Sequence, residues 1–425
     1  MSVPRFSSFA CGLSAETAFD VLAVARRLKV AGKDVIELQI GDSPFSSTRS
    51  AVAAGLKAIQ NGQTHYCASP GVPSFREAVA HNYHYEFGVA VGPENVVVGP
   101  GAKVFEQFFC EVFLDPGDAV LVFTPHFPTY GPNIERRGGR IVCSPLRQAN
   151  QFRPDLNDVE RFVRSTPRAK AIFLNSPHNP TGGVATAADL RALAEMVRGR
   201  DIALFSDEPY CHMVWQGRHE TPLSQPGMLA QTVACYTFSK SYSMSGWRLG
   251  YAIADAAVAE AMSKMINTSL SCVPPLVQAA GQAALEHDAA ERDEVMGRFR
   301  NKVELLVEAL RRVEGVTVLM PAGTFYVFPD VSSHCQRLGI TSHGLAMFLL
   351  EAADERLGVA CLGGECFGAA GQGFLRFSCA EPDERLRQAV AFLAEAVTRT
   401  ERVEKYLQTH PKYRLAAEPV LAGGR

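Results

Sequence analysis

The residues best suited to chemistry in this sequence surround one lysine. Residues 236–251 read YTFSKSYSMSGWRLGY, which puts Lys240 among hydroxyl side chains and Arg248 eight positions later. The apolar run 233–236 before them is typical of a strand. A Ser-Lys pair alone is usually a solvated loop, but a lysine amine can also form a Schiff base with a carbonyl cofactor such as pyridoxal phosphate. That chemistry needs a phosphate site, a partner for a ring nitrogen and an anchor for a carboxylate.

A glycine turn earlier in the chain could bind the phosphate. Residues 99–103 read GPGAK, between a strand-like run at 96–98 and a helical pattern at 102–113. Such a turn exposes backbone N–H groups at the positive end of the helix dipole, which attracts anions. Many α/β proteins use a similar turn for packing alone. The turn is neither G-x-G-x-x-G nor a P-loop, and this disfavours a nucleotide as the ligand.

Two further polar segments follow strand-like runs. Residues 175–183 read NSPHNPTGG after the run 171–174, and Asn179 could donate a hydrogen bond to a phenolic oxygen. Residues 206–210 read SDEPY after the run 202–205. A buried carboxylate is costly unless it is paired, so Asp207 is either the partner of a protonated pyridine nitrogen or a helix cap. Tyr210 could reach an oxygen of the same ring.

The elements around these residues predict an α/β protein of two domains. Short apolar runs at 96–98, 119–123, 140–143, 171–174, 202–205, 233–236 and 250–253 alternate with helical patterns. Strands so apolar are buried on both faces, which predicts a mainly parallel seven-stranded sheet covered by helices. After a long helix at 292–313 come strand-like runs at 316–319, 324–328 and 373–377 and helices at 341–353 and 382–398, which predict a smaller α+β domain.

The predicted boundaries are 47–295 for the large domain, 1–46 with 296–400 for the small domain, and 401–425 for a polar, partly unstructured tail.

Composition narrows the classes of function. The chain has 425 residues, 47% of them hydrophobic and 20% charged, and a net charge of -2. These values disfavour a general role on nucleic acids or membrane surfaces. The eleven cysteines lack C-x-x-C or metal-ligand spacing, which favours buried thiols in a reducing cytosol and predicts no metal site. No apolar stretch approaches the roughly 20 residues of a membrane helix, and the first ten residues do not resemble a signal peptide. We therefore expect a cytoplasmic protein.

Taken together, the motifs resemble those of one enzyme family. The segments 99–103, 175–182, 206–210 and 239–240, then Arg248 and FLRFS at 374–378, occur in the order seen in the class I/II aminotransferases. These are fold-type I pyridoxal-phosphate enzymes of the aspartate aminotransferase superfamily. The resemblance covers about residues 32–398. It implies transfer of an amino group from an amino acid to a 2-oxo acid, with 2-oxoglutarate as the expected acceptor and pyridoxal 5′-phosphate as the cofactor.

The resemblance also implies roles for individual residues. Lys240 matches the lysine that forms the internal aldimine and moves the α-proton, Asp207 the partner of the ring nitrogen, and Asn179 and Tyr210 the ligands of the ring oxygen O3′. The implied catalytic residues are therefore Lys240, Asp207 and Tyr210. The implied phosphate and ring contacts come from Gly101, Ala102, Lys103, Phe127, Thr237, Ser239 and Arg248.

Further matches concern the substrate and a second subunit. Arg376 matches the arginine that binds the substrate α-carboxylate. Gly41 matches a backbone contact near that carboxylate, and Asn179 is also implied to bind the substrate. Tyr66 matches the tyrosine that reaches the phosphate in the neighbouring subunit, which implies a homodimer. Two departures concern the substrate: in GDSPF at 41–45 the proline is shifted by one place, and His178 occupies a variable position.

The same residues serve related reactions, so three other reactions remain as alternatives to transamination. A C–S β-lyase, a cyclopropane amino acid synthase and an amino acid oxidase of this fold would use the same lysine and aspartate. A non-catalytic pyridoxal-phosphate-binding regulator would need an N-terminal DNA-binding domain, for which the residues before Gly32 are too few. The sequence does not identify the side chain of the amino donor.

Overall fold

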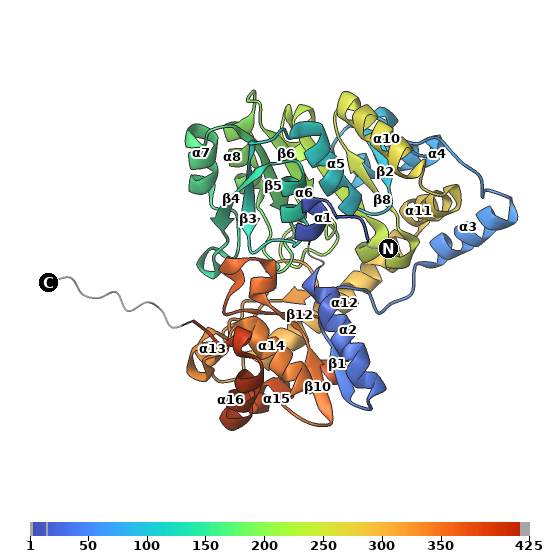
Figure 1. Cartoon of the computed structure of the whole chain (residues 1–425). Coiled ribbons are helices and arrows are strands. Elements are labelled where there is room, and N and C mark those ends of the chain that lie inside the picture. The colour runs from blue at the N-terminus through green and yellow to red at the C-terminus, as the bar shows by residue number, and fades with distance from the viewer. Residues whose placement is uncertain (1–2, 14–15, 417–425) are drawn as a thin grey trace. The chain divides into compact units, whose positions relative to one another are not determined.

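The computed structural model describes residues 3–13 and 16–416 of the chain (Figure 1). It divides into two compact units. The large unit comprises Met1–Ala15, Asp42–Asn301 and Pro321–Phe325, and the small unit comprises Glu16–Gly41, Lys302–Met320 and Tyr326–Arg425. The sequence put residues 1–46 in the small domain, whereas of the described residues in that range 3–13 and 42–46 belong to the large unit.

A seven-stranded sheet forms the centre of the large unit. Its strands are β2 (Val96–Gly99), β3 (Ala119–Thr124), β4 (Arg140–Pro145), β5 (Ala169–Asn175), β6 (Ala203–Asp207), β7 (Thr232–Thr237) and β8 (Gly250–Ile253). Their order across the sheet is β2-β8-β7-β6-β5-β3-β4. β8 pairs antiparallel with both β2 and β7, and the other neighbouring strands pair in parallel. The mainly parallel seven-stranded sheet is thus confirmed.

Alternate residues of the strands enter two separate apolar cores, one on each face of the sheet. Val96 and Val98 of β2 belong to one core, whereas Val97 belongs to the other. The first core is covered by α3 (Arg49–Gln60), α4 (Pro73–Phe87) and α11 (Pro275–His287). The second is covered by α5 (Lys103–Phe113), α6 (Tyr130–Arg136) and α10 (Ala256–Leu270). Burial of both faces explains why the strands read as nearly continuous apolar runs.

The remaining helices of the large unit connect or flank these elements. They include α1 (Ser8–Gly12), α7 (Leu156–Ser165), α8 (Ala187–Val197) and the short α9 (Phe238–Ser241), and α12 (Ala289–Leu310) begins in this unit. The register across β5, β6 and β7 pairs Asn175 with Asp207 and Asp207 with Cys235. The loops that follow these parallel strands therefore leave the sheet side by side, where α/β proteins bind ligands.

The small unit contains two smaller sheets. β1 (Asp34–Glu37) pairs in parallel with β10 (Leu357–Ala360), and β12 (Leu375–Ser378) pairs antiparallel with β11 (Leu362–Gly363) and β9 (Tyr326–Val327). The helices α2 (Thr17–Val30), α13 (Ser332–Leu338), α14 (Ser342–Glu351) and α15 (Asp383–Ala396) accompany them. The strand predicted at 316–319 is wrong, because there only Thr317 forms a bridge, to Asp330.

Residues 401–416, predicted to be part of the tail, are folded. The helix α16 (Thr400–Thr409) buries Val403, Tyr406 and Leu407. The Tyr406 ring lies 5.7 Å from that of Phe348 in α14, and its hydroxyl donates to Glu351 at 2.7 Å. The segment is polar on one side only, so its mean polarity is a poor guide to its order. Residues 417–425 lie outside the described residues.

No helix among the described residues is long and apolar enough to cross a bilayer. The same residues contain no group of three or more histidine, cysteine or acidic side chains placed to hold a metal ion.

Candidate active site

A buried carboxylate lies at the carboxyl end of β6. Asp207 is 6% exposed, and it accepts hydrogen bonds from the Tyr130 hydroxyl at 2.5 Å and the Cys235 thiol at 3.4 Å. Both donors are neutral, and burial raises the pKa of the Asp207 carboxyl above its usual value. A cationic partner would favour the ionised carboxylate in this environment, and a protonated pyridine nitrogen is such a partner.

The Asn179 loop is fixed beside this carboxylate by the end of β5. The Asn175 amide donates to the backbone oxygen of Asp207 at 2.8 Å, and its side-chain oxygen accepts from the Asn179 N–H at 2.8 Å. His178, also in the loop, is buried with Nδ1 2.8 Å from the Thr181 hydroxyl. Burial lowers the pKa of His178 to about 3. This histidine is therefore a neutral structural group at physiological pH.

Lys240 and Tyr210 lie around one aromatic ring. The Lys240 amine is 5.7 Å from the centroid of the Phe325 ring, and the Tyr210 ring meets the same ring edge-on at 6.1 Å. Lys240 belongs to α9, which directly follows β7, and Tyr210 to the turn after β6. The neighbouring strands β6 and β7 thus deliver both side chains to the same end of the sheet.

The glycine turn, the hydroxyl cluster and Arg248 form one cradle. Gly99 pairs with Gly250, which pairs with Thr237. Arg248 donates to the Pro100 carbonyl at 2.9 Å. Gly101 has φ +95°, and a Cβ there would lie 2.7 Å from the Arg248 guanidinium. The hydroxyls of Thr237 and Ser239 are 2.8 Å apart. A guanidinium, hydroxyls and the N-terminus of α5, which starts at Lys103 after Ala102, suit a phosphate group.

Phe127 connects this cradle with the buried carboxylate. The Lys103 amine lies 5.1 Å from the Phe127 ring centroid, and the Phe127 ring meets the Tyr130 ring edge-on at 6.0 Å. Tyr130 in turn donates to Asp207. A flat ring held between the cradle and Asp207 would therefore have an aromatic side chain within reach.

In the small unit, the predicted substrate residues lie around Tyr326. Arg376 is 4% exposed, with its guanidinium 4.3 Å from the Tyr326 ring and 4.9 Å from the Phe367 ring, and it donates to the Gln39 carbonyl at 2.5 Å. A Cβ at Gly41 would overlap the Tyr326 hydroxyl. A guanidinium positioned by two rings presents its planar donors to a carboxylate, as bidentate binding requires.

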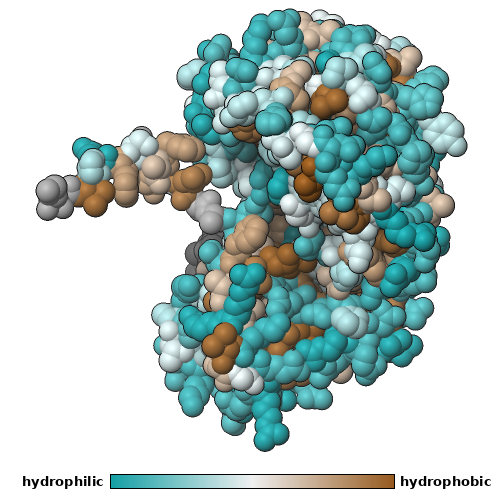
Figure 2. Space-filling model, turned by 90° about the vertical axis from the view of Figure 1, so that its right-hand side faces the viewer, coloured by the Kyte–Doolittle hydropathy of each residue, from teal (hydrophilic) through white to brown (hydrophobic). Residues whose placement is uncertain are grey.

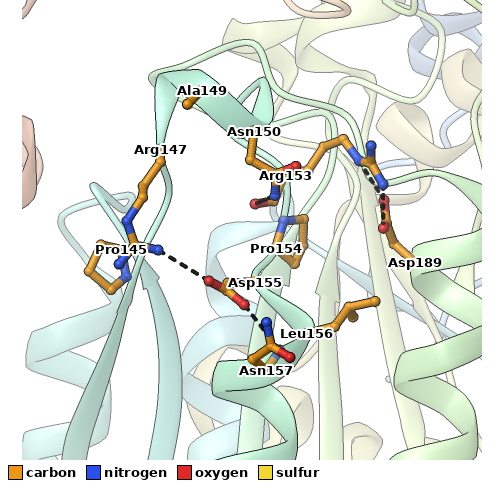
Figure 3. Close-up of a pocket in the computed structure, with 10 residues that line it drawn as sticks. All are labelled: Pro145, Arg147, Ala149, Asn150, Arg153, Pro154, Asp155, Leu156, Asn157 and Asp189. Atoms are coloured by element: carbon orange, nitrogen blue, oxygen red, sulfur yellow. Dashed lines mark hydrogen bonds and ion pairs between the residues drawn. The ribbon is translucent and has the colours of Figure 1, made fainter.

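One predicted residue and one surface cleft stand apart. Tyr66 is 87% exposed, so most of its surface meets solvent in the single chain. A cleft of about 410 Å³ on the large unit is lined by none of the predicted site residues. Its arginines are already engaged, Arg147 with Asp155 at 3.1 Å and Arg153 with Asp189 at 2.6 Å (Figure 3). The cleft is separate from the candidate active site.

Sequence reasoning missed several residues that complete this geometry. Tyr130, Cys235 and Asn175 contact Asp207 or its loop, and Phe325 contacts Lys240. Asn175 directly follows an apolar run, so its position at a strand end was a usable signal. Cys235 and Phe325 lie in largely apolar stretches of the sequence, where nothing distinguishes them from core residues. Tyr130 lies in a turn-like stretch, FPTYGPN at 127–133, which gives no sign of its contact with Asp207.

Comparison with known proteins identifies the family. The family model for aminotransferase class I and II matches residues 33–393. The chain belongs to the class I and II aminotransferases. The enzymes of this family depend on pyridoxal phosphate, and the protein is a pyridoxal-phosphate-dependent transaminase. The cofactor predicted from the motifs is confirmed.

Individual relatives of this aminotransferase differ in their substrates. A probable aspartate/prephenate aminotransferase of Aquifex aeolicus is 35% identical over 89% of this chain and 94% of its own. An arginine–pyruvate transaminase of Pseudomonas aeruginosa is 32% identical over 92% and 97%. Among solved structures, the aspartate aminotransferase from Thermus thermophilus with maleate matches with a TM-score of 0.86 at 31% identity, covering 93% of this chain and 100% of that one.

Proposed function

We propose that this aminotransferase moves the amino group of an L-amino acid to 2-oxoglutarate, with the Lys240 amine as the covalent attachment point of the cofactor. The observation that carries the proposal is the buried Asp207 carboxylate, which has neutral donors and lies at the end of β6, beside the strand β7 that leads into the helix of Lys240. When bound, pyridoxal phosphate supplies a conjugated ring that accepts negative charge from the substrate α-carbon.

Each group of side chains has a defined task in this proposal. The Lys240 amine removes the proton from the substrate α-carbon. Asp207 holds the proton on the ring nitrogen, so the ring stays electron-withdrawing. Asn179 and Tyr210 bind the ring oxygen, and Phe127 packs on the ring. The cradle around Gly101 and Arg248 binds the phosphate.

The substrate carboxylate is assigned to the small unit. Arg376 binds it through two parallel hydrogen bonds, and Gly41 offers its backbone beside Tyr326. The amino donor is not assigned, because the relatives carry names as different as aspartate, arginine and alanine aminotransferases.

Lys240→Ala tests the assignment directly. The variant should bind pyridoxal phosphate without covalent attachment, so borohydride reduction should no longer fix cofactor to the protein, and transamination should fall below detection. Retention of full activity would refute the role of Lys240. Wild-type enzyme supplied with a panel of amino acids and 2-oxoglutarate should form glutamate. Pyruvate formed without an acceptor, or peroxide, would instead favour a lyase or an oxidase.

We also propose that the enzyme is a homodimer in which Tyr66 reaches the phosphate of the partner. Support comes from α3, where Val52, Leu56 and Ile59 are 37%, 58% and 50% exposed and form a stripe next to the buried Ala51, Gly55 and Ala58. Figure 2 views the side of the molecule on which α3 lies in Figure 1, and shows hydrophobic residues among hydrophilic ones there. A second copy of the chain would cover this stripe.

All eleven cysteines are free, and we infer from this that the enzyme works in the reducing cytoplasm.

A further inference from the structure

A hydrogen bond joins the helix of Lys240 to the turn of Tyr210. Ser241 directly follows Lys240 in α9, and His212 is two residues after Tyr210. Nδ1 of His212 lies 2.8 Å from the Ser241 hydroxyl. The Ser241 residue is 2% exposed and the His212 side chain 16% exposed, so solvent competes little for this bond.

The other side of His212 is anchored by two further helices. Its Nε2 lies 2.7 Å from the Glu86 carboxylate of α4 and 2.9 Å from the Arg292 guanidinium of α12. Arg292 also forms an ion pair with Glu86 and donates to the Tyr242 hydroxyl at 3.3 Å. All of these residues belong to the large unit. His212 thus links a fixed ion pair to the residue beside Lys240.

The protonation states of His212 and Glu86 decide which group donates each hydrogen bond. Burial lowers the pKa of His212, although the hydrogen bond with Glu86 opposes this. Burial raises the pKa of Glu86, but its bonds with His212 and Arg292 outweigh that effect and bring it to about 2. A neutral His212 therefore lies beside an ionised pair.

The shorter contact of Nε2 is with Glu86, which assigns its proton to that bond and leaves Nδ1 to accept from Ser241. Other titratable groups also face the ring: the Cys211 thiol lies 3.4 Å from Nδ1, the Tyr242 ring meets the His212 ring edge-on at 6.1 Å, and His219 acts on it electrostatically.

We propose that His212 is a positioning residue that, through Ser241, holds the Lys240 amine in place relative to Tyr210. The inference rests on the proposed role of Lys240. The helix α9 has four residues, too few to hold one geometry by its own backbone bonds, so its side-chain contacts fix it. The Ser241 bond leads from the residue next to Lys240 to the turn that carries Tyr210. Removing it would let the amine move without changing any group assigned to the cofactor.

Ser241→Ala and His212→Leu break this link, and Ser144→Ala is the matched control. Ser144 of β4 is fully buried, as Ser241 nearly is. Its hydroxyl donates one hydrogen bond of 2.8 Å to Asp158 of α7. His212→Asn is a rescue variant, because the Asn amide can occupy the place of Nδ1 opposite Ser241. Two properties of the purified holoenzyme are measured. The first is the rate at which it releases the cofactor, and the second is the pH dependence of the absorbance of the cofactor attached to Lys240. Thermal unfolding is measured in parallel.

We expect Ser241→Ala and His212→Leu to release cofactor about three- to tenfold faster than wild type, the size of one buried hydrogen bond, and to shift the absorbance titration. Ser144→Ala should lose comparable stability with neither change, and His212→Asn should recover part of the wild-type behaviour. If Ser241→Ala and His212→Leu lose stability but match Ser144→Ala in both cofactor readouts, the inference is wrong. Wild-type protein without cofactor on Lys240 would instead refute the proposed function itself.

Discussion

At the scale of single residues, the charge of Asp207 matters more than its shape. Asp207→Asn keeps the size of the side chain and removes the negative charge that would pair with the ring nitrogen. We expect kcat to fall about 10- to 100-fold, the effect of losing one charged hydrogen bond in a buried site. Steady-state kinetics with saturating pyridoxal phosphate measure this. A variant with wild-type kcat would contradict the assignment.

Tyr130→Phe tests the role of one hydrogen-bond donor to Asp207 while the carboxylate itself is kept. It leaves Asp207 in place but removes the 2.5 Å hydrogen bond that stabilises its ionised form. Losing that bond raises the pKa of Asp207 further, so the protonated, inactive form gains population as pH falls. Activity should therefore be lost at a higher pH than in wild type, with little change above neutral pH. A pH–kcat profile that coincides with that of wild type would exclude this role of Tyr130.

Tight cofactor binding should depend on glycine at position 101, because of its backbone conformation and its closeness to Arg248. Gly101→Ala places a Cβ 2.7 Å from Arg248 at φ +95°, so it strains the turn and displaces the guanidinium. Gly199→Ala is the control, since Gly199 has φ +72° and open space around it. Both variants should lose stability of about 1 kcal/mol, but only Gly101→Ala should weaken cofactor binding, by about tenfold or more. Fluorescence titration of the cofactor-free proteins compares the two.

At the scale of elements, the apolar runs located the strands of the large sheet because burial on both faces leaves a simple signal. Strand β8 was predicted with the bounds that the structure has. The register between the strands could not be predicted from the sequence, since it depends on which strands become neighbours. Asp207 and Cys235 illustrate this, because 28 residues separate them and only pairing of β6 with β7 brings them together. The strands β10 and β11 were missed, and β11 has only two residues, too few to show a period.

Helix α8 begins with a polar cluster whose strength should depend on pH. Asp189 accepts hydrogen bonds from the Thr186 N–H at 2.8 Å and from the Arg153 guanidinium at 2.8 and 2.6 Å. Burial raises the pKa of Asp189, but the bonds with Arg153 and Thr186 outweigh it and hold the pKa below the ordinary value of 3.8. The stabilisation is therefore complete above that value and is lost as pH falls below it.

Asp189→Asn should be less stable than wild type by about 1 to 3 kcal/mol at pH 7. The difference should shrink below pH 3.8, where the wild-type carboxylate takes up its proton. Urea unfolding at several pH values measures both effects. Asp201→Asn is the control, because Asp201 is 92% exposed in its pair with Lys170 and such pairs contribute little. A pH-independent difference for Asp189→Asn would contradict the ionic origin.

At the scale of the whole molecule, the chain does not divide into consecutive domains. Pro321–Phe325 belongs to the large unit, although the residues on both sides of it belong to the small unit. The Trp215 indole donates to the Thr324 carbonyl at 2.6 Å, and this inserted segment supplies Phe325 beside Lys240. The sequence pattern predicts that this segment is part of a strand of the small domain. It cannot show that the segment belongs to the large unit, because the residues it contacts there are more than 80 positions away along the chain.

The proposed homodimer predicts that two defective chains can restore each other. Tyr66→Ala keeps its own Lys240 and needs a partner's Tyr66, whereas Lys240→Ala keeps Tyr66 and lacks the amine. A heterodimer of the two therefore contains one complete site, and it should show about half of the wild-type activity per dimer. The measurement uses heterodimers purified through two different affinity tags after co-expression.

The pair Lys240→Ala with Asp207→Asn provides the control. Both residues belong to the large unit of one chain, so no arrangement of these two variants yields a complete site. Its heterodimer should stay as inactive as its defective chains. If the Tyr66→Ala and Lys240→Ala heterodimer is no more active than this control and Tyr66→Ala alone, Tyr66 does not act across subunits. The exposed stripe of α3 would then need a different explanation, since covering it would no longer complete an active site.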